Sequence, residues 1–166
     1  MIYIYNKIYN TSFFFEDNTA KDLIESIEKE TLMKLKNWEI VEIDDNEKFA
    51  LSKFLDINPK DIEVTPYCED KSYVKYTVGE KSVNKYDAGS FLVLTEKEAN
   101  ELARRKLQKE FDTEVNRTDI AEEYFDKEKW ITDNMQQRGW VIAIDPFDED
   151  IETVNGVDYF IYKVKN

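Results

Sequence analysis

Residues 90–99, with the sequence SFLVLTEKEA, combine the two clearest structural signals in the chain. The first half is an unbroken apolar run, which is typical of a strand buried on both faces. The second half is a capping box, in which the Thr95 side chain accepts from the third helical N–H and Glu98 reaches back to the cap. We therefore predict a buried strand that ends where a long helix begins.

The same periodicities predict the elements that follow. Apolar residues at helical spacing continue over 99–111, and a further set over 120–135 predicts another long helix. Gly139 is a natural helix stop, and we interpret the apolar residues 140–144 after it as a strand. A last strand is predicted over 157–164, because an Asn-Gly hairpin signal stands directly before it.

Strands and helices also alternate upstream of the central strand. We predict, in order, a strand over 2–9, an amphipathic helix over 20–38, a strand over 38–43, a short helix over 49–55 and a strand over 72–78. No linker rich in Gly, Ser or Pro divides the chain, and the order lacks the regular βαβ alternation of a parallel sheet. We therefore predict an α+β fold, a largely antiparallel sheet with three longer helices, in a single compact domain over residues 1–166.

The composition excludes several kinds of chemistry. The chain has 166 residues, no His and one Cys. Without His, Ser-His triads and His-ligated metal sites are excluded, and one Cys excludes an intramolecular disulfide and a Cys-cluster zinc site. Cys68 is followed by Glu69 and Asp70, whose negative charges do not favour a reactive thiolate. We expect this thiol to be structural or incidental and the protein to reside in a reducing cytoplasm.

The sequence predicts no cofactor and no bound metal. Neither glycine-rich phosphate-binding motif occurs, and the chain has only four Gly. With 36 acidic residues, no single pair of carboxylates stands out as a catalytic acid and base. No run of about 20 apolar residues and no signal peptide are found, so we expect a cytoplasmic protein that does not enter a membrane.

The charge distribution gives the candidate site. The net charge is −13, which argues against direct binding to a nucleic-acid backbone. Acidic residues are concentrated in residues 38–70 and in residues 145–158, and the second segment has six acids and no base. A charged coat that keeps the protein soluble is one interpretation. The other is a surface that binds a basic partner, formed by Asp44, Asp45, Glu47, Tyr67, Glu69, Asp70, Asp145, Phe147, Asp148, Glu149, Asp150 and Glu152.

Basic residues gather instead on the helix that follows Thr95. Arg104, Arg105 and Lys106 are consecutive there. Such a cluster can bind an anion, but on a helix it more often forms a solvated face with partners one turn away, such as Glu101 for Arg105. We expect the solvated face.

Parts of the chain resemble small acidic proteins of phages and mobile elements. The resemblance lies in residues 54–63 (FLDINPKDIE) and 91–99 (FLVLTEKEA), the Gly139-Trp140 segment and residues 159–163 (YFIYK). It implies a shared fold, and this group is of largely unknown function, with no catalytic residues to carry over. By type, as a short acidic chain without a cofactor motif, the protein also resembles phage anti-CRISPR and anti-restriction inhibitors.

These observations favour an inhibitor that is not an enzyme. We expect it to bind a host defence nuclease, such as a CRISPR effector, and to present an acidic surface that mimics nucleic acid to the cations of that enzyme. Association would be salt-sensitive, and inhibition would be lost when Asp148, Glu149 and Asp150 become Asn, Gln and Asn. A small carboxylate-dependent enzyme and a phage structural or assembly accessory protein remain the alternatives. The oligomeric state is left open.

Overall fold

The computed structural model describes residues 2–6, 12–15, 38–116, 126–144 and 149–164 of the chain. The chain divides into two compact units, Met1–Ala88 and Gly89–Asn166, and each is described by itself. Two compact units can belong to one domain, so the single domain over residues 1–166 stays a prediction.

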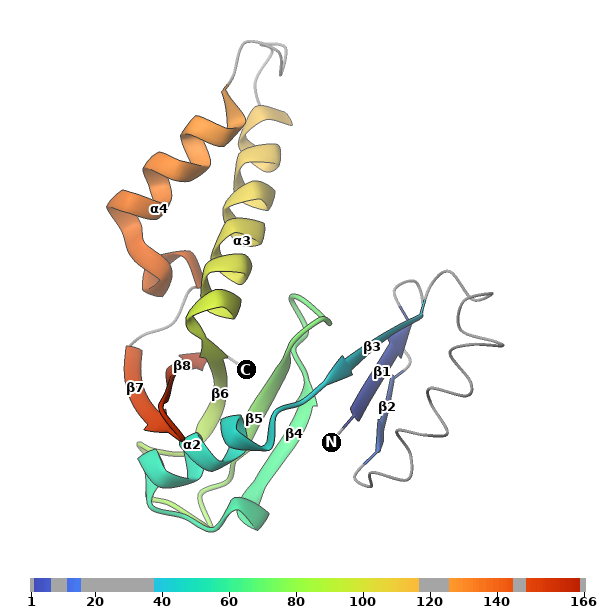
Figure 1. The fold of residues 1–166 in the computed structure, drawn as a ribbon, viewed down its shortest axis with the longest axis vertical. Helices are drawn as coiled ribbons and strands as arrows, with labels where there is room; N and C mark the ends of the chain where they lie inside the picture. The colour runs from blue at the N-terminus through green and yellow to red at the C-terminus, as the bar shows by residue number, and fades with distance from the viewer. Residues whose placement is uncertain (1, 7–11, 16–37, 117–125, 145–148, 165–166) are drawn as a thin grey trace. The chain divides into compact units, whose positions relative to one another are not determined.

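The α+β class with a largely antiparallel sheet is confirmed (Figure 1). The described strands form a three-stranded sheet in the order β2-β1-β3 and a five-stranded sheet in the order β4-β5-β6-β8-β7. The strands are β1 (Ile2–Asn6), β2 (Ser12–Phe15), β3 (Trp38–Glu42), β4 (Ile62–Pro66), β5 (Val74–Val78), β6 (Gly89–Thr95), β7 (Glu149–Val154) and β8 (Val157–Val164). The helices are α2 (Asp45–Leu55), the 3-10 helix η2 (Pro59–Asp61), α3 (Glu96–Asn116) and α4 (Lys127–Ile144). The helix predicted over 20–38 lies outside the described residues, except for its last residue, which begins β3.

In the first unit, strand β1 is paired on both sides. Ile4 lies opposite Phe13 of β2 and opposite Ile40 of β3, and its side chain is buried. Tyr5 is also buried, and its hydroxyl donates to the Glu39 carboxylate across the β1–β3 pair at 2.5 Å. Strands β4 and β5 pair antiparallel with each other, and Tyr76 lies opposite Val64.

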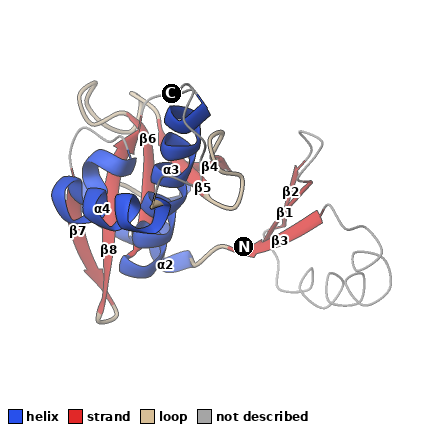
Figure 2. Ribbon diagram, turned by 90° about the horizontal axis from the view of Figure 1, so that it is seen from above, coloured by secondary structure: helices blue, strands red, loops and turns tan. Residues whose placement is uncertain are grey.

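In the second unit, strand β6 is buried from Ser90 to Leu94 and pairs along its length with β8. The predicted capping box is present where β6 ends. The Thr95 backbone N–H donates to the Glu98 carboxylate at 2.8 Å, and the Glu98 N–H donates to the Thr95 hydroxyl at 3.4 Å. The strand therefore passes into α3 without a linker, as Figures 1 and 2 both show.

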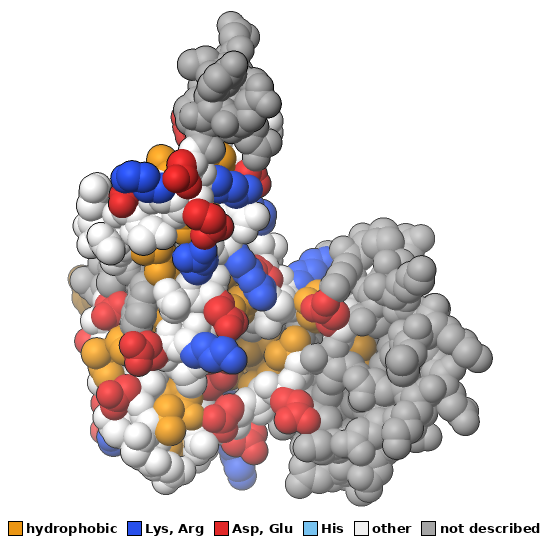
Figure 3. Space-filling view, turned by 45° about the horizontal axis from the view of Figure 1, so that its top comes forward, with side chains coloured by type: hydrophobic (Ala, Val, Ile, Leu, Met, Phe, Trp, Pro, Cys, Tyr) orange, Lys and Arg blue, Asp and Glu red, His pale blue; other side chains and the backbone are white. Residues whose placement is uncertain are grey.

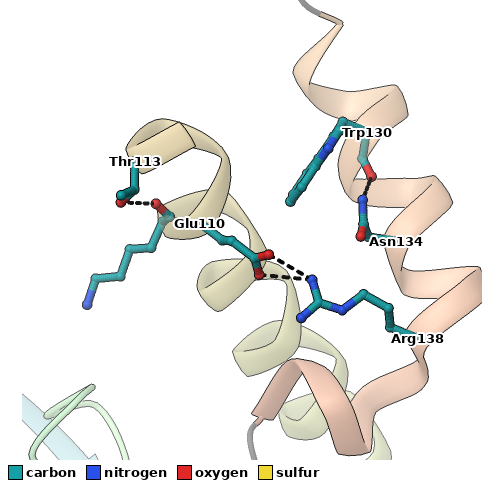
Figure 4. A network of polar contacts seen from close by, with 6 residues as sticks. Glu110, Thr113, Trp130, Asn134 and Arg138 are labelled. Atoms are coloured by element: carbon teal, nitrogen blue, oxygen red, sulfur yellow. Dashed lines mark hydrogen bonds and ion pairs between the residues drawn. The ribbon is translucent and has the colours of Figure 1, made fainter. Parts of the chain in front are cut away.

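Helices α3 and α4 pack side by side, with an aromatic contact and ion pairs between them. The rings of Phe111 and Trp130 lie 5.5 Å apart between their centroids. Arg138 donates twice to the Glu110 carboxylate, at 2.9 Å to each oxygen (Figure 4). Two further ion pairs of 2.6 Å join the helices, Arg104 with Glu128 and Lys127 with Asp112.

The predicted strand over 140–144 is wrong, because these residues continue helix α4. Gly139 does interrupt the helix, with φ 67° and ψ 179°, but the chain then returns to helical geometry. Ile144 is fully buried, and its carbonyl accepts a hydrogen bond of 2.7 Å from the Lys106 ammonium. A short apolar run is compatible with a strand or with a helix. In this protein the run is helical, and it contacts α3 through the bond between Lys106 and Ile144.

Among the described residues, no helix combines the length and the apolar character needed to cross a membrane.

Candidate interaction surface at helix α2

Helix α2 begins at a cap that the sequence encodes locally. Asp44 has extended backbone angles, and its carboxylate accepts the Asn46 N–H at 2.9 Å. Asp45 and Glu47 follow in the first turn, where negative charge opposes the positive end of the helix dipole. The acidic start of α2 therefore has a structural role, which any binding role must accommodate.

The two faces of α2 differ in character. Ala50 and Leu51 are fully buried and fix the inner face. Asp45 and Phe49 are one turn apart and therefore share the opposite face. Asp45 is exposed there, and 51% of the Phe49 side chain is accessible to solvent.

An open groove of about 380 Å³ lies beside Phe49, lined by Asp45, Asn46, Lys48, Phe49 and Pro59. Pro59 belongs to η2, where the Asn58 side chain caps the turn by accepting the Lys60 N–H at 3.0 Å. Complete burial of a phenylalanine side chain contributes about 1.5–3 kcal/mol, so covering the exposed half of Phe49 would contribute about 1 kcal/mol. The groove thus offers an apolar anchor beside an exposed carboxylate.

The prediction that Glu47 faces a partner is corrected by its burial. Only 8% of the residue is exposed, and its carboxylate accepts a hydrogen bond of 2.5 Å from the hydroxyl of Tyr76. Tyr76 is itself fully buried in β5. A buried carboxylate requires such a donor, so Glu47 joins α2 to the β4–β5 pair and is not available to a partner.

Tyr67 is likewise buried, which corrects its prediction as an interface anchor. Its hydroxyl donates to the exposed Glu69 carboxylate at 2.9 Å. The Asp70 carboxylate accepts from both the backbone N–H and the hydroxyl of Ser72, at 3.1 and 2.5 Å. Glu69 and Asp70 therefore shape the turn between β4 and β5.

The second predicted acidic segment is described only in part, since Asp145, Phe147 and Asp148 lie outside the described residues. Glu149, Asp150 and Glu152 belong to β7. Because neighbouring residues of a strand point to opposite faces, Glu149 lies on one face of β7, and Asp150 and Glu152 lie on the other. These three described acids therefore do not share one face of the strand.

Glu149 lies opposite Tyr162 of β8, and this pair has an unusual electrostatic environment. Tyr162 is fully buried, and its hydroxyl lacks hydrogen-bond geometry to any described residue. Burial, followed by the nearby Glu149 carboxylate, raises the pKa of the Tyr162 hydroxyl. The phenol is therefore held neutral.

The basic cluster on α3 is engaged within the fold. Arg104 pairs with Glu128, and Lys106 donates to the Ile144 carbonyl, so both hold α4 against α3. These two contacts come from the neighbouring helix. The expected pairing of Arg105 with Glu101 on α3 itself stays a prediction. In the described part of the chain, no group of three or more Cys, Asp or Glu side chains could hold a metal ion. Cys68 is a free, exposed thiol.

Sequence reasoning missed Phe49 as a surface residue and placed it with the apolar residues of a short helix. A signal was present: Ala50, Leu51 and Phe54 define one helical face, and Phe49 falls on the far side of it. Figure 3 shows that acidic, basic and apolar side chains are intermixed on the described part of one molecular face. Exposed apolar residues are therefore found between charged ones on this face.

Comparison with protein-family models, with curated proteins and with solved structures finds no match for this chain. The resemblance to acidic phage proteins consequently stays a prediction.

Proposed function

We propose that this protein is an inhibitor that binds a basic, nucleic-acid-handling protein, such as a host defence nuclease, through the groove at helix α2. One observation carries the proposal: Phe49 is half exposed in an open groove, one helical turn from the exposed Asp45. Aromatic side chains that become buried on binding supply much of the affinity of protein interfaces.

The charge of the molecule supports a cationic partner. The net charge of −13 attracts a basic surface over a distance and accelerates encounter at low salt. Exposed carboxylates at Asp44 and Asp45 lie next to the groove at the start of α2. They would face Lys and Arg side chains that otherwise hold phosphates, and so would compete with nucleic acid for them.

The test begins with affinity capture by the tagged protein from a host-cell lysate, with nuclease treatment and at low and high salt. The captured nuclease, once purified, is then titrated with wild-type protein in a cleavage assay. Inhibition that is complete at a stoichiometric ratio is expected, because an inhibitor by occupancy must titrate its target. Time-dependent loss of activity at a small fraction of that ratio would instead favour the enzyme alternative.

Phe49→Ala is the diagnostic variant, and Tyr86→Ala is its matched control. Tyr86 is 88% exposed in the same unit but does not line the groove. Phe49→Ala is expected to weaken inhibition by at least about tenfold, as for a central interface residue, and Tyr86→Ala to leave it unchanged. Equal inhibition by both variants would refute a role for the groove.

The second acidic segment is tested separately. Changing Asp148, Glu149 and Asp150 to Asn, Gln and Asn removes three negative charges from the segment around the start of β7. If inhibition survives this change and is lost in Phe49→Ala, the α2 groove is the binding surface. Loss of inhibition in the triple variant alone would indicate that the binding surface lies in the second unit.

A further inference from the structure

The α2 groove has two walls that hydrogen bonds within the first unit hold in place. One wall is the start of α2 as far as Phe49, and the other is Pro59 of η2. The Ser52 hydroxyl donates to the Phe49 carbonyl at 2.8 Å, and the Ile57 N–H donates to the Ser52 carbonyl at 3.0 Å, which fixes the chain that leaves α2 toward η2. The groove is therefore present in the free protein, and a preformed site reduces the entropy lost on binding.

The surface of the groove is suited to a planar cation on an apolar stem. Phe49 is half exposed, and Pro59 supplies a second, partly exposed ring. The face of an aromatic ring attracts a cation, and a planar guanidinium stacks on such a face. The methylene groups of an arginine side chain also cover apolar surface while the charged head stays near water. A guanidinium over Phe49 would therefore leave its stem beside Pro59.

Two opposite charges line the groove, and they differ in how far each can move. Asp45 lies one helical turn before Phe49, and its carboxylate is carried on a short side chain. Asp45 also interacts within the protein, but a carboxylate has about four acceptor positions and can take a further, bidentate donor. Lys48 is half-buried, and its long stem lets the ammonium turn toward water. The groove therefore favours a cation over an anion.

We infer that the α2 groove takes an arginine side chain of the partner protein, with the guanidinium stacked on the Phe49 ring and paired with the Asp45 carboxylate. Arginine is preferred to lysine, because both contacts require a planar group with several N–H donors. This inference rests on the proposed function, since it names the side chain of the partner that the groove binds. Proteins that bind nucleic acids use arginine to hold phosphates, so its capture would remove such a contact.

The test is a nuclear magnetic resonance titration of the full-length protein, with isotope-labelled phenylalanines, by a capped pentapeptide that has one arginine between glycines. Matched peptides carry lysine in its place, or citrulline, which is planar but neutral. The arginine peptide should shift the Phe49 ring signals to saturation and show a nuclear Overhauser contact between this ring and the arginine δ-methylene. The lysine and citrulline peptides should bind at least about threefold more weakly, because each lacks the stacked, charged guanidinium.

Four protein variants, followed by their backbone amide signals, identify the groups involved. Phe49→Leu keeps an apolar side chain but loses the ring, and Asp45→Asn loses the charge, so each should weaken binding of the arginine peptide by about threefold. Glu63→Gln removes an exposed acid of the same unit that does not line the groove, and should change binding by less than about 1.5-fold. Lys48→Gln removes a like charge and should strengthen binding by about twofold.

The nuclease assay separates this inference from the proposed function. If Phe49→Ala weakens inhibition but Phe49→Leu inhibits like the wild type, the function stands and the arginine site is refuted. If the arginine peptide binds as expected but neither variant changes inhibition, the function at the groove is refuted and the arginine site stands. Three results of the titration would also overturn the inference: no saturable binding, equal binding of the arginine and citrulline peptides, or weaker binding to Lys48→Gln, which would indicate an anionic occupant.

Discussion

At the scale of single residues, burial separates acids of similar sequence context. Asp45 and Glu47 both stand in the first turn of α2, yet Asp45 is exposed and Glu47 is buried. The difference follows from helical geometry and from the Tyr76 hydroxyl, which supplies the hydrogen bond that a buried carboxylate needs. Tyr76 lies 29 residues further along the chain, so a local pattern could not reveal this pairing.

Replacing Tyr76 by Phe should destabilise the protein by about 1–3 kcal/mol, because a buried carboxylate loses a donor. The measurement is equilibrium unfolding in urea. Glu47→Gln is the matched variant, since its amide oxygen can still accept from Tyr76, and it should cost less than Tyr76→Phe. A Tyr76→Phe protein as stable as the wild type would show that the hydrogen bond contributes nothing net.

Tyr162 gives a prediction in which the stability of the folded protein depends on pH. Its folded pKa is raised above the unfolded value of about 10, so the neutral phenol favours the folded state. That contribution is complete below about pH 10 and is lost as the pH rises further, because the unfolded phenol then ionises first. Tyr162→Phe should match the wild type at pH 7 and be the more stable of the two above about pH 10. Parallel unfolding curves over this range would contradict the assignment.

At the scale of elements, the sequence predicted the helices and strands that are marked by a short local pattern. The apolar run and capping box gave β6 and the start of α3, and the Asn-Gly turn gave the start of β8. Strand β7 was missed because its sequence, EDIETV, carries acids on both faces, and pairing with β8 defines it as a strand. Of the candidate site, Asp44 and Asp45 could be located from the cap, but the exposure of Phe49 depends on which face of α2 is covered.

Gly139 allows a test of how helix α4 is built. Its φ of 67° with ψ of 179° lies in a region that is almost exclusive to glycine. Gly139→Ala should cost about 1–3 kcal/mol in urea unfolding through backbone strain, since a Cβ there meets no atom within 4 Å. Gly79→Ala is the control, because a Cβ at Gly79 is also unhindered and its backbone lacks a positive φ. Equal costs at the two positions would exclude strain as the cause.

At the scale of the whole molecule, repulsion between like charges lowers the stability of the fold, and ion pairs raise it. The net charge of −13 produces self-repulsion in the folded chain. The ion pairs between α3 and α4 are partly exposed, and such pairs each contribute at most about 1 kcal/mol. The repulsion is therefore expected to dominate.

Sodium chloride should accordingly stabilise the protein. Raising the ionic strength from about 0.01 to about 1 M shortens the screening length from about 30 to about 3 Å, which suppresses repulsion across the surface. The urea midpoint should rise over this range. A falling midpoint would show that the ion pairs outweigh the repulsion, and Arg138→Ala would then remove part of the salt dependence.

The direct passage of β6 into α3 has a mechanical consequence. Thr95 is both the last residue of the strand and the cap of the helix, so α3 is joined to the sheet directly and not through a loop. The helix has 21 residues, which at about 1.5 Å each gives it a length of about 30 Å. If the strand twist changed by about 5° at Thr95 and α3 followed as a rigid body, the C-terminal end of α3 would move by about 2.5 Å, given that length. We therefore predict that small torsions of the sheet displace Asn116, which a spectroscopic label at this position would detect.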